Sequence, residues 1–217
     1  MRHGNRNRVG ANWFLGGRKS GAGGVRILGE EHRVLNNYFQ DLPGDELRGA
    51  ICVMEGDKNN NLSGYAPVKG GLIAFNTMVD CKEPLSLGIG YRKISVPPKG
   101  LRVIGNLIVN KRAGAKVINE CNASGCGLEE NVVSGKVKLN ELPGLRKQTI
   151  KMSDIEYGYK RPVKPVWIQP RTADVLPKSD IHELARAPRH SAGSEFAPDT
   201  DPVPLPQAAS DAGPRSD

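Results

Sequence analysis

The middle of the chain alternates apolar and polar residues in a way that predicts β-strands. Leu85, Leu87 and Ile89 alternate with small or polar residues, and the segment 133–139 repeats the pattern with lysines and a serine. A period of two places alternate side chains on one face, so we expect half-buried antiparallel strands. Uninterrupted apolar runs predict further strands covered on both faces, at Ala50–Met54, Gly71–Phe75 and Leu101–Val109.

Turn residues separate these runs, so six or seven short strands are expected with little helix between them. Pro97-Pro98 and the segments 59–61 and 142–144 supply the turns. One peripheral helix is an alternative for the segment 30–40, and no internal repeat is apparent. The predicted fold is all-β, a jelly-roll-like antiparallel sandwich.

Composition divides the chain into three zones. Residues 1–29 carry several arginines and no acid, which is typical of a flexible basic arm. Residues 30–161 form the β-rich core domain. Residues 162–217 hold ten of the sixteen prolines and predict a disordered C-terminal tail.

The charge of the chain favours a polyanionic partner. The formal net charge is +8, and no acid occurs between Glu83 and Glu120. Such a stretch predicts a positively charged surface that binds along a phosphate backbone. Aromatic residues make up only 5% of the chain, which is too few for extensive base stacking. The alternative is an ordinary solvated strand face. The residues expected to bind nucleic acid without sequence specificity are Arg92, Lys93, Lys99, Arg102, Lys111, Arg112 and Lys116.

Enzymatic chemistry finds little support in the sequence. The glycines around Arg18 and Lys19 lack the spacing of a phosphate-binding loop, and His32 is the one histidine placed to act as a buried base. Cys121 and Cys126 could supply two zinc ligands, but no histidine is nearby. We therefore expect a protein that is not an enzyme and uses no cofactor and no metal. Four cysteines and no signal peptide favour a reducing compartment.

The stretch 42–58 resembles the signature of the thirty-kilodalton superfamily of plant-virus cell-to-cell movement proteins. It reads Leu-Pro-Gly-Asp, then a glycine and an apolar strand that ends at an aspartate; the matching residues are Leu42, Pro43, Gly49 and Asp57. Other segments up to residue 161 look like parts of some members. The alternative for Asp57 is a turn residue that bonds its own backbone.

The resemblance implies a movement protein that carries single-stranded viral nucleic acid through plasmodesmata, associates with host endomembranes and self-associates. The expected location is the host cytoplasm and the plasmodesmata. A viral capsid or other jelly-roll structural protein is the alternative, because a basic arm ahead of β-strands suits it equally. A small silencing suppressor or transcriptional regulator is a third hypothesis.

Overall fold

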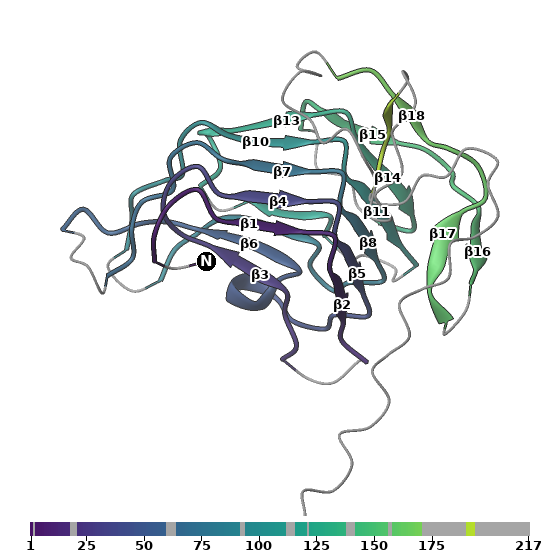
Figure 1. Ribbon diagram of the computed structural model, residues 1–217, viewed down its shortest axis with the longest axis horizontal. Helices are drawn as coiled ribbons and strands as arrows, with labels where there is room; N and C mark the ends of the chain where they lie inside the picture. Colours follow the sequence, from purple (N-terminus) through teal and green to yellow (C-terminus); the bar gives the residue numbers. More distant parts are fainter. Residues whose placement is uncertain are drawn as a thin grey trace, which may run out of the picture.

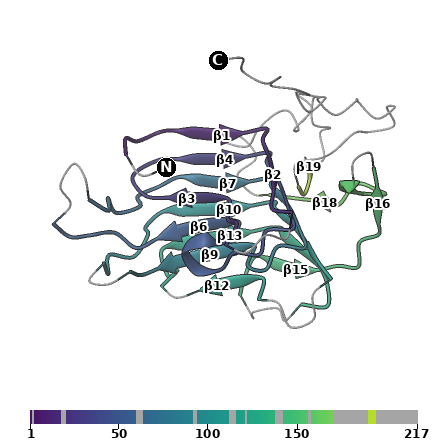
Figure 2. The same cartoon turned by 90° about the horizontal axis from the view of Figure 1, so that it is seen from below.

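The computed structural model describes residues 1, 3–17, 21–59, 64–91, 94–111, 116–120, 122–137, 142–155, 158–170 and 190–193. Within them the chain coils repeatedly around one axis, and successive coils add strands to three sheets (Figures 1 and 2). Every pairing in these three sheets is parallel. The architecture is therefore a parallel β-helix.

The three sheets are built almost entirely from strands of three to five residues. Sheet A contains β1 (Arg8–Gly10), β4 (Arg33–Leu35), β7 (Leu72–Ala74), β10 (Leu101–Ile104) and β13 (Cys126–Glu129). Sheet B contains β2 (Trp13–Leu15), β5 (Tyr38–Gln40), β8 (Thr77–Val79), β11 (Leu107–Asn110), β14 (Asn131–Gly135) and β15 (Leu145–Lys147). Sheet C contains β3 (Val25–Ile27), β6 (Ile51–Met54), β9 (Leu85–Ile89) and β12 (Ile118–Glu120).

The remaining elements lie on a connection within a coil or after the last coil. A single-turn 3-10 helix, η1 (Glu46–Arg48), precedes β6. Two antiparallel pairs follow the last coil: β16 (Met152–Asp154) with β17 (Lys160–Pro162), and β18 (Trp167–Ile168) with β19 (His190–Ser191). No helix in the described part of the chain is long and apolar enough to cross a membrane.

A ladder of stacked asparagines forms the corner between sheets A and B. Two residues make the corner in most coils; the first has a positive φ and the second is an asparagine. In each step the backbone N–H and the side-chain amide of one asparagine both donate to the side-chain oxygen of the next, at 2.8–3.1 Å. Because this arrangement pairs the polar groups of a buried corner, it fixes the register of successive coils. The members of this asparagine ladder are Asn12, Asn37, Asn76, Asn106 and Asn131.

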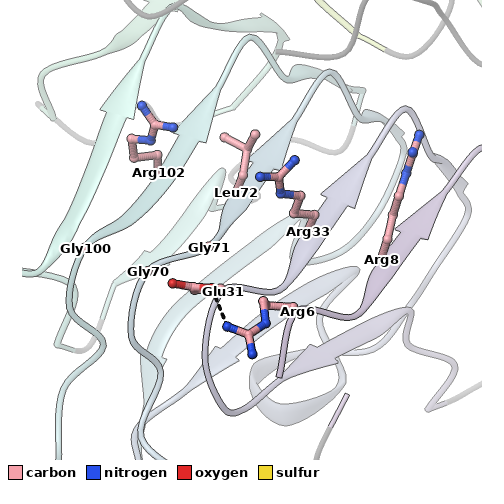
Figure 3. A pocket seen from close by; sticks show the side chains of 9 residues that line it. All are labelled: Arg6, Arg8, Glu31, Arg33, Gly70, Gly71, Leu72, Gly100 and Arg102. Atoms are coloured by element: carbon pink, nitrogen blue, oxygen red, sulfur yellow. Dashed lines mark ion pairs between the residues drawn. The ribbon is translucent and has the colours of Figure 1, made fainter. Parts of the chain in front are cut away.

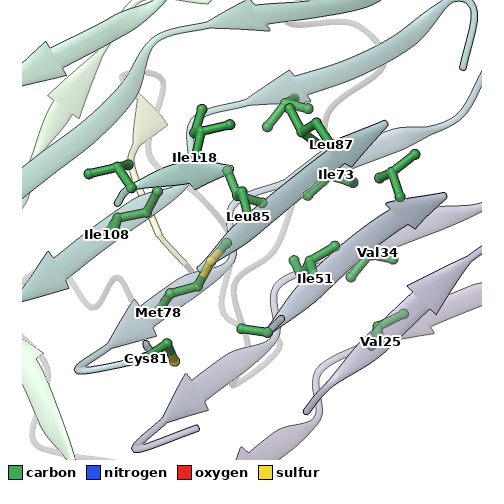
Figure 4. Close-up of a cluster of buried hydrophobic side chains, with 14 of the residues drawn as sticks. Val25, Val34, Ile51, Ile73, Met78, Cys81, Leu85, Leu87, Ile108 and Ile118 are labelled. Atoms are coloured by element: carbon green, nitrogen blue, oxygen red, sulfur yellow. The ribbon is translucent and has the colours of Figure 1, made fainter. Parts of the chain in front are cut away.

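The core fills the space that the three sheets enclose. Val34, Ile73 and Val103 stack inward from sheet A. Val34 and Ile73 lie in one cluster with apolar side chains of sheets B and C, among them Met78 and Leu85 (Figure 4). The side chains of Val34, Ile73 and Val103 are fully buried. A second apolar cluster on the outside of the A–B corner is covered by Val166, Ile168 and Ala192.

These observations correct the predicted fold class. The apolar runs at 51–54, 72–74 and 101–104 are strands, but they belong to parallel sheets and not to an antiparallel jelly-roll-like sandwich. The expected strand 101–109 is two strands, since Gly105 and Asn106 turn the corner. The segment 30–40 contains β4 and β5 in place of a helix.

The chain also has the repeat that was not apparent from the sequence. Successive members of the asparagine ladder are 25, 39, 30 and 25 residues apart. Residues 8–27, expected to lie in the basic arm, supply β1, β2 and β3 of the first coil. The segments 171–189 and 194–217 of the expected tail are outside the described residues.

Candidate functional site

The outer face of sheet A presents a line of side chains that the parallel register creates. Arg8 pairs with Arg33, Arg33 with Leu72, and Leu72 with Arg102. Register neighbours in adjacent strands lie about 4.8 Å apart, so Arg33 and Arg102 are separated by about 9–10 Å across Leu72. We call Arg8, Arg33 and Arg102 the arginine row.

The turn that leads into sheet A forms the floor beside this row. Arg6, Glu31, Gly70 and Gly100 hold corresponding places in successive coils, and all four have a φ between 55° and 67°. The two glycines place no side chain on this part of the turn, so the floor is open at their positions. Together these residues line a groove of about 650 Å³ (Figure 3).

The groove carries an excess of positive charge. Four arginines and one glutamate line it, which leaves three positive charges. Glu31 pairs with Arg6, with 3.6 Å between Oε2 and Nη1 (Figure 3). Among the described residues no carboxylate pairs with Arg8, Arg33 or Arg102. The arginine row is therefore available to an external anion.

His32 lies beneath the groove and ties the first coil to the second. Its side chain is only 2% exposed. The ring atom Nε2 is 2.7 Å from the carbonyl oxygen of Leu28, and the backbone N–H of Asn7 donates to Nδ1 at 3.1 Å. A carbonyl can only accept, so Nε2 carries the hydrogen and the ring is neutral. Burial lowers the pKa of His32 from its ordinary value of 6.5, and the hydrogen bond to the Leu28 carbonyl opposes this shift.

A row of guanidinium groups at the strand spacing suits a linear polymer that carries repeated carboxylates. Arginine binds carboxylates through paired, charge-assisted hydrogen bonds that a lysine cannot make. Leu72 lies between Arg33 and Arg102 and is only 4% exposed, because it packs into the apolar cluster outside the A–B corner. The arrangement can hold an extended polyanion along sheet A and neutralise its acidic groups.

The structure brings only part of the predicted nucleic-acid site together. Arg102 lies in the groove, and Lys99 lies on the turn that leads to it. Lys111 follows β11 of sheet B and Lys116 precedes β12 of sheet C, so both lie on other turns of the coil. Arg92, Lys93 and Arg112 are outside the described residues.

Sequence reasoning missed most of the groove. Arg6 and Arg8 fell within the expected arm, and Arg33 was not singled out. No local motif marks the three row positions, because they meet only through the register of coils 25 to 39 residues long. An asparagine stands two residues after the end of each sheet A strand. Aligning the chain on these asparagines is the step that would have brought the three arginine positions together.

The residues of the supposed movement-protein signature have structural roles in the coil. Leu42 is buried in the core, Pro43 is half-buried beside it, and Gly49 is packed so closely that a Cβ would lie 2.3 Å from Oγ of Ser86. The backbone N–H of Asn59 donates to Oδ1 of Asp57 at 3.0 Å. Asp57 therefore adopts the turn role that was the alternative reading.

Cysteines and acidic residues do not form a metal site in the described part of the chain. No group of three His, Cys, Asp or Glu side chains gathers there. Cys52 and Cys81 are buried in the coil and Cys126 is half-buried. Cys121 is outside the described residues.

Comparisons with known proteins find that this chain is similar to polysaccharide lyases. The family model described as chondroitinase B matches residues 1–169. A solved family 6 alginate lyase, AlyGC, shares 28% identity with a TM-score of 0.70 and covers 76% of this chain. A variant of the same lyase with one arginine replaced by alanine shares 25% identity, with a TM-score of 0.71 and 93% of this chain covered.

A further alginate lyase of the same family, solved with a trisaccharide, shares the fold with a TM-score of 0.61 at 16% identity; it covers 85% of this chain and 43% of its own. This chain spans 23% and 27% of the two AlyGC structures, or about a quarter of their length. No curated protein matches the sequence.

These findings overturn the functional hypotheses drawn from the sequence. The family match and the solved lyases contradict the resemblance to viral movement proteins. They equally contradict a capsid function, a non-enzymatic role and single-stranded viral nucleic acid or plasmodesmal components as partners. The short signature at 42–58 was misleading because it consists largely of glycine and proline turn residues and one apolar strand, which a β-helix also contains.

Proposed function

Since this chain belongs to the chondroitinase B family, we propose that it binds an acidic polysaccharide along sheet A as part of a polysaccharide lyase. The observation that carries the proposal is the arginine row, three guanidinium groups that are aligned by the register of the coils and pair with no carboxylate of the described residues. Alginate is the first candidate substrate, because the similar solved structures include the alginate lyase AlyGC, at 28% identity, and a variant of it, at 25%.

The chemistry of a lyase explains why arginines are useful there. The reaction breaks the C5–H and C4–O bonds of a uronate residue and forms a C4=C5 double bond, and the leaving oxygen gains a proton. Neutralising the C6 carboxylate makes the C5 proton more acidic, and guanidinium groups supply that neutralisation. We assign this binding and neutralising role to Arg8, Arg33 and Arg102.

His32 is not assigned as the base that removes the C5 proton. Both of its ring nitrogens are engaged by backbone groups, and the side chain is buried beneath the groove. A general base must reach the proton it removes, which this histidine cannot do in its present place.

Calorimetric titration of the full chain with alginate oligosaccharides tests the binding. Arg33→Gln should weaken binding about tenfold, the effect of losing one hydrogen-bonded charge pair. Lys116→Gln is the matched control, because it removes one positive charge from a turn outside the groove. Equal losses for both variants, or no binding by the parent chain, would contradict the proposed site.

Lyase activity is measured by the ultraviolet absorbance of the unsaturated product. We expect alginate to give this signal and Arg33→Gln to reduce it. Chondroitin sulfate is the second candidate, because the matching family model carries that description. A product signal with chondroitin sulfate but not with alginate would reverse the order of the candidates.

A further inference from the structure

His32 is the buried titratable side chain closest to the groove, and its contacts bridge two coils. Asn7, its partner, lies between Arg6 and Arg8 in the sequence. The segment 5–7 also meets the second coil through Arg6 N–H to the Glu30 carbonyl and Glu30 N–H to the Asn5 side chain. The N–H of Arg33 also donates to the Asn7 carbonyl at 2.9 Å, so a small set of hydrogen bonds holds these three residues against the second coil.

We infer that His32 is a positioning residue of the groove: its neutral imidazole clamps the segment that carries Arg6 and Arg8, and protonation of the ring releases that segment. The inference rests on the proposed function only in so far as it concerns substrate affinity.

The geometry leaves no room for a second proton on the ring. An imidazolium donates from both nitrogens, so its Nδ1–H would point at the N–H of Asn7. Two donors would then face each other in a site that is 2% exposed. Such a contact costs the free energy of a buried hydrogen bond, and moving the segment 5–7 away relieves it.

The sign of the pH effect follows from the direction of the pKa shift. The pKa of His32 is lowered in the folded chain, chiefly by burial, so the unfolded chain binds its proton more readily. The stabilisation is therefore complete above about pH 6.5 and is lost as the pH falls below it. The carboxylates of a polyuronate and the guanidinium groups keep their charges through this range.

Other charged groups lie on the elements around the ring and have to be separated from its effect. The amino group of Met1 opposes a positive charge on the ring, and an ion pair joins Lys69 to Glu30 at 2.8 Å. His3 lies exposed in the same segment as Asn7. The full set comprises Met1, His3, Arg6, Arg8, Glu30, Glu31, Arg33 and Lys69.

Amide hydrogen exchange tests the clamp without any ligand. We expect the protection factor of the Asn7 N–H to fall between about pH 7 and about pH 5, while core amides such as Ile73 keep theirs. The His3→Gln control should behave as the parent does. An Asn7 protection factor that stays constant over this range would overturn the inference.

Binding of alginate oligosaccharides tests the consequence for the groove. The parent affinity should fall about tenfold between about pH 7 and about pH 5, and His32→Gln should have an affinity that does not change with pH. Glutamine cannot be protonated, so pH dependence that persists in this variant would assign the effect to other groups and overturn the inference. If no oligosaccharide binds the parent, the proposed function fails, and the exchange measurement still decides the role of His32.

Discussion

The asparagine ladder and the arginine row both repeat one residue type at the spacing of the coils, but with opposite consequences. In the ladder each side-chain amide both donates and accepts, so identical residues stack favourably inside a buried corner. In the row identical residues repel each other, and solvent screens the repulsion only in part. Stacked copies of one residue stabilise the coils when the side chains can both donate and accept hydrogen bonds. Stacked copies that carry the same charge form instead a surface that an oppositely charged ligand can neutralise.

Breaking the ladder in its middle should have the largest effect on stability. Asn76→Ala removes the oxygen that accepts from the backbone N–H and the side-chain amide of Asn37, and it strands the carbonyl of Val34. Unpaired buried groups of this kind cost about 1–3 kcal/mol each, so we expect a loss of about 3–5 kcal/mol in the free energy of unfolding. Urea denaturation measures it.

The control for this loss is the same substitution at the exposed end of the ladder. Asn12→Ala should cost less than about 1 kcal/mol, because the Asn12 side chain is exposed and water can replace the amide that donates to Gly10 and Asn37. Similar losses at both positions would mean that the ladder does not depend on burial.

Removing the arginine row should leave stability intact and abolish binding. The triple variant Arg8→Gln, Arg33→Gln, Arg102→Gln should lower affinity for alginate oligosaccharides about a hundredfold or more and flatten its salt dependence. Its melting temperature should equal or exceed that of the parent, because three like charges have been removed. A large drop in melting temperature would show that the arginine row, like the asparagine ladder, stabilises the fold.

The smallest effect should come from the one carboxylate in the groove. Glu31 holds Arg6 in an exposed pair, so Glu31→Gln frees a fourth guanidinium group for the ligand. Exposed pairs are worth about 0.2–1 kcal/mol, which predicts a gain in affinity of up to about fivefold at low salt. The gain should shrink as salt is added; a gain that does not depend on salt would argue against an electrostatic cause.

The strand content could be read from the sequence, but the way the strands pair could not. The apolar runs at 51–54 and 72–74 identified real strands, since a buried strand is apolar on both faces in parallel and sandwich folds alike. Strands of three residues are too short for alternation to reveal their partners. Coil lengths from 25 to 39 residues concealed the repeat.

The candidate site was out of reach for a related reason. Arg102 was singled out for its charge, whereas Arg8 was assigned to an arm and Arg33 passed unnoticed. Charge along the sequence identified a basic protein, but the row exists only once the register sets Arg8 beside Arg33 and Leu72 beside Arg102. The recurring asparagine before an apolar strand was the local signal of that register.

The two kinds of corner in the coil also determine where such a protein can be altered. The A–B corner is fixed at two residues in the first four coils, whereas the connections from sheet C back to sheet A vary, with 17 residues between Met54 and Leu72 and 11 between Ile89 and Leu101. Length added at these connections leaves the register of sheet A untouched. The groove floor at Gly70 and Gly100 can therefore be kept while the earlier part of each connection is rebuilt, and new loops grafted after β6 would change which ligands fit without refolding the scaffold.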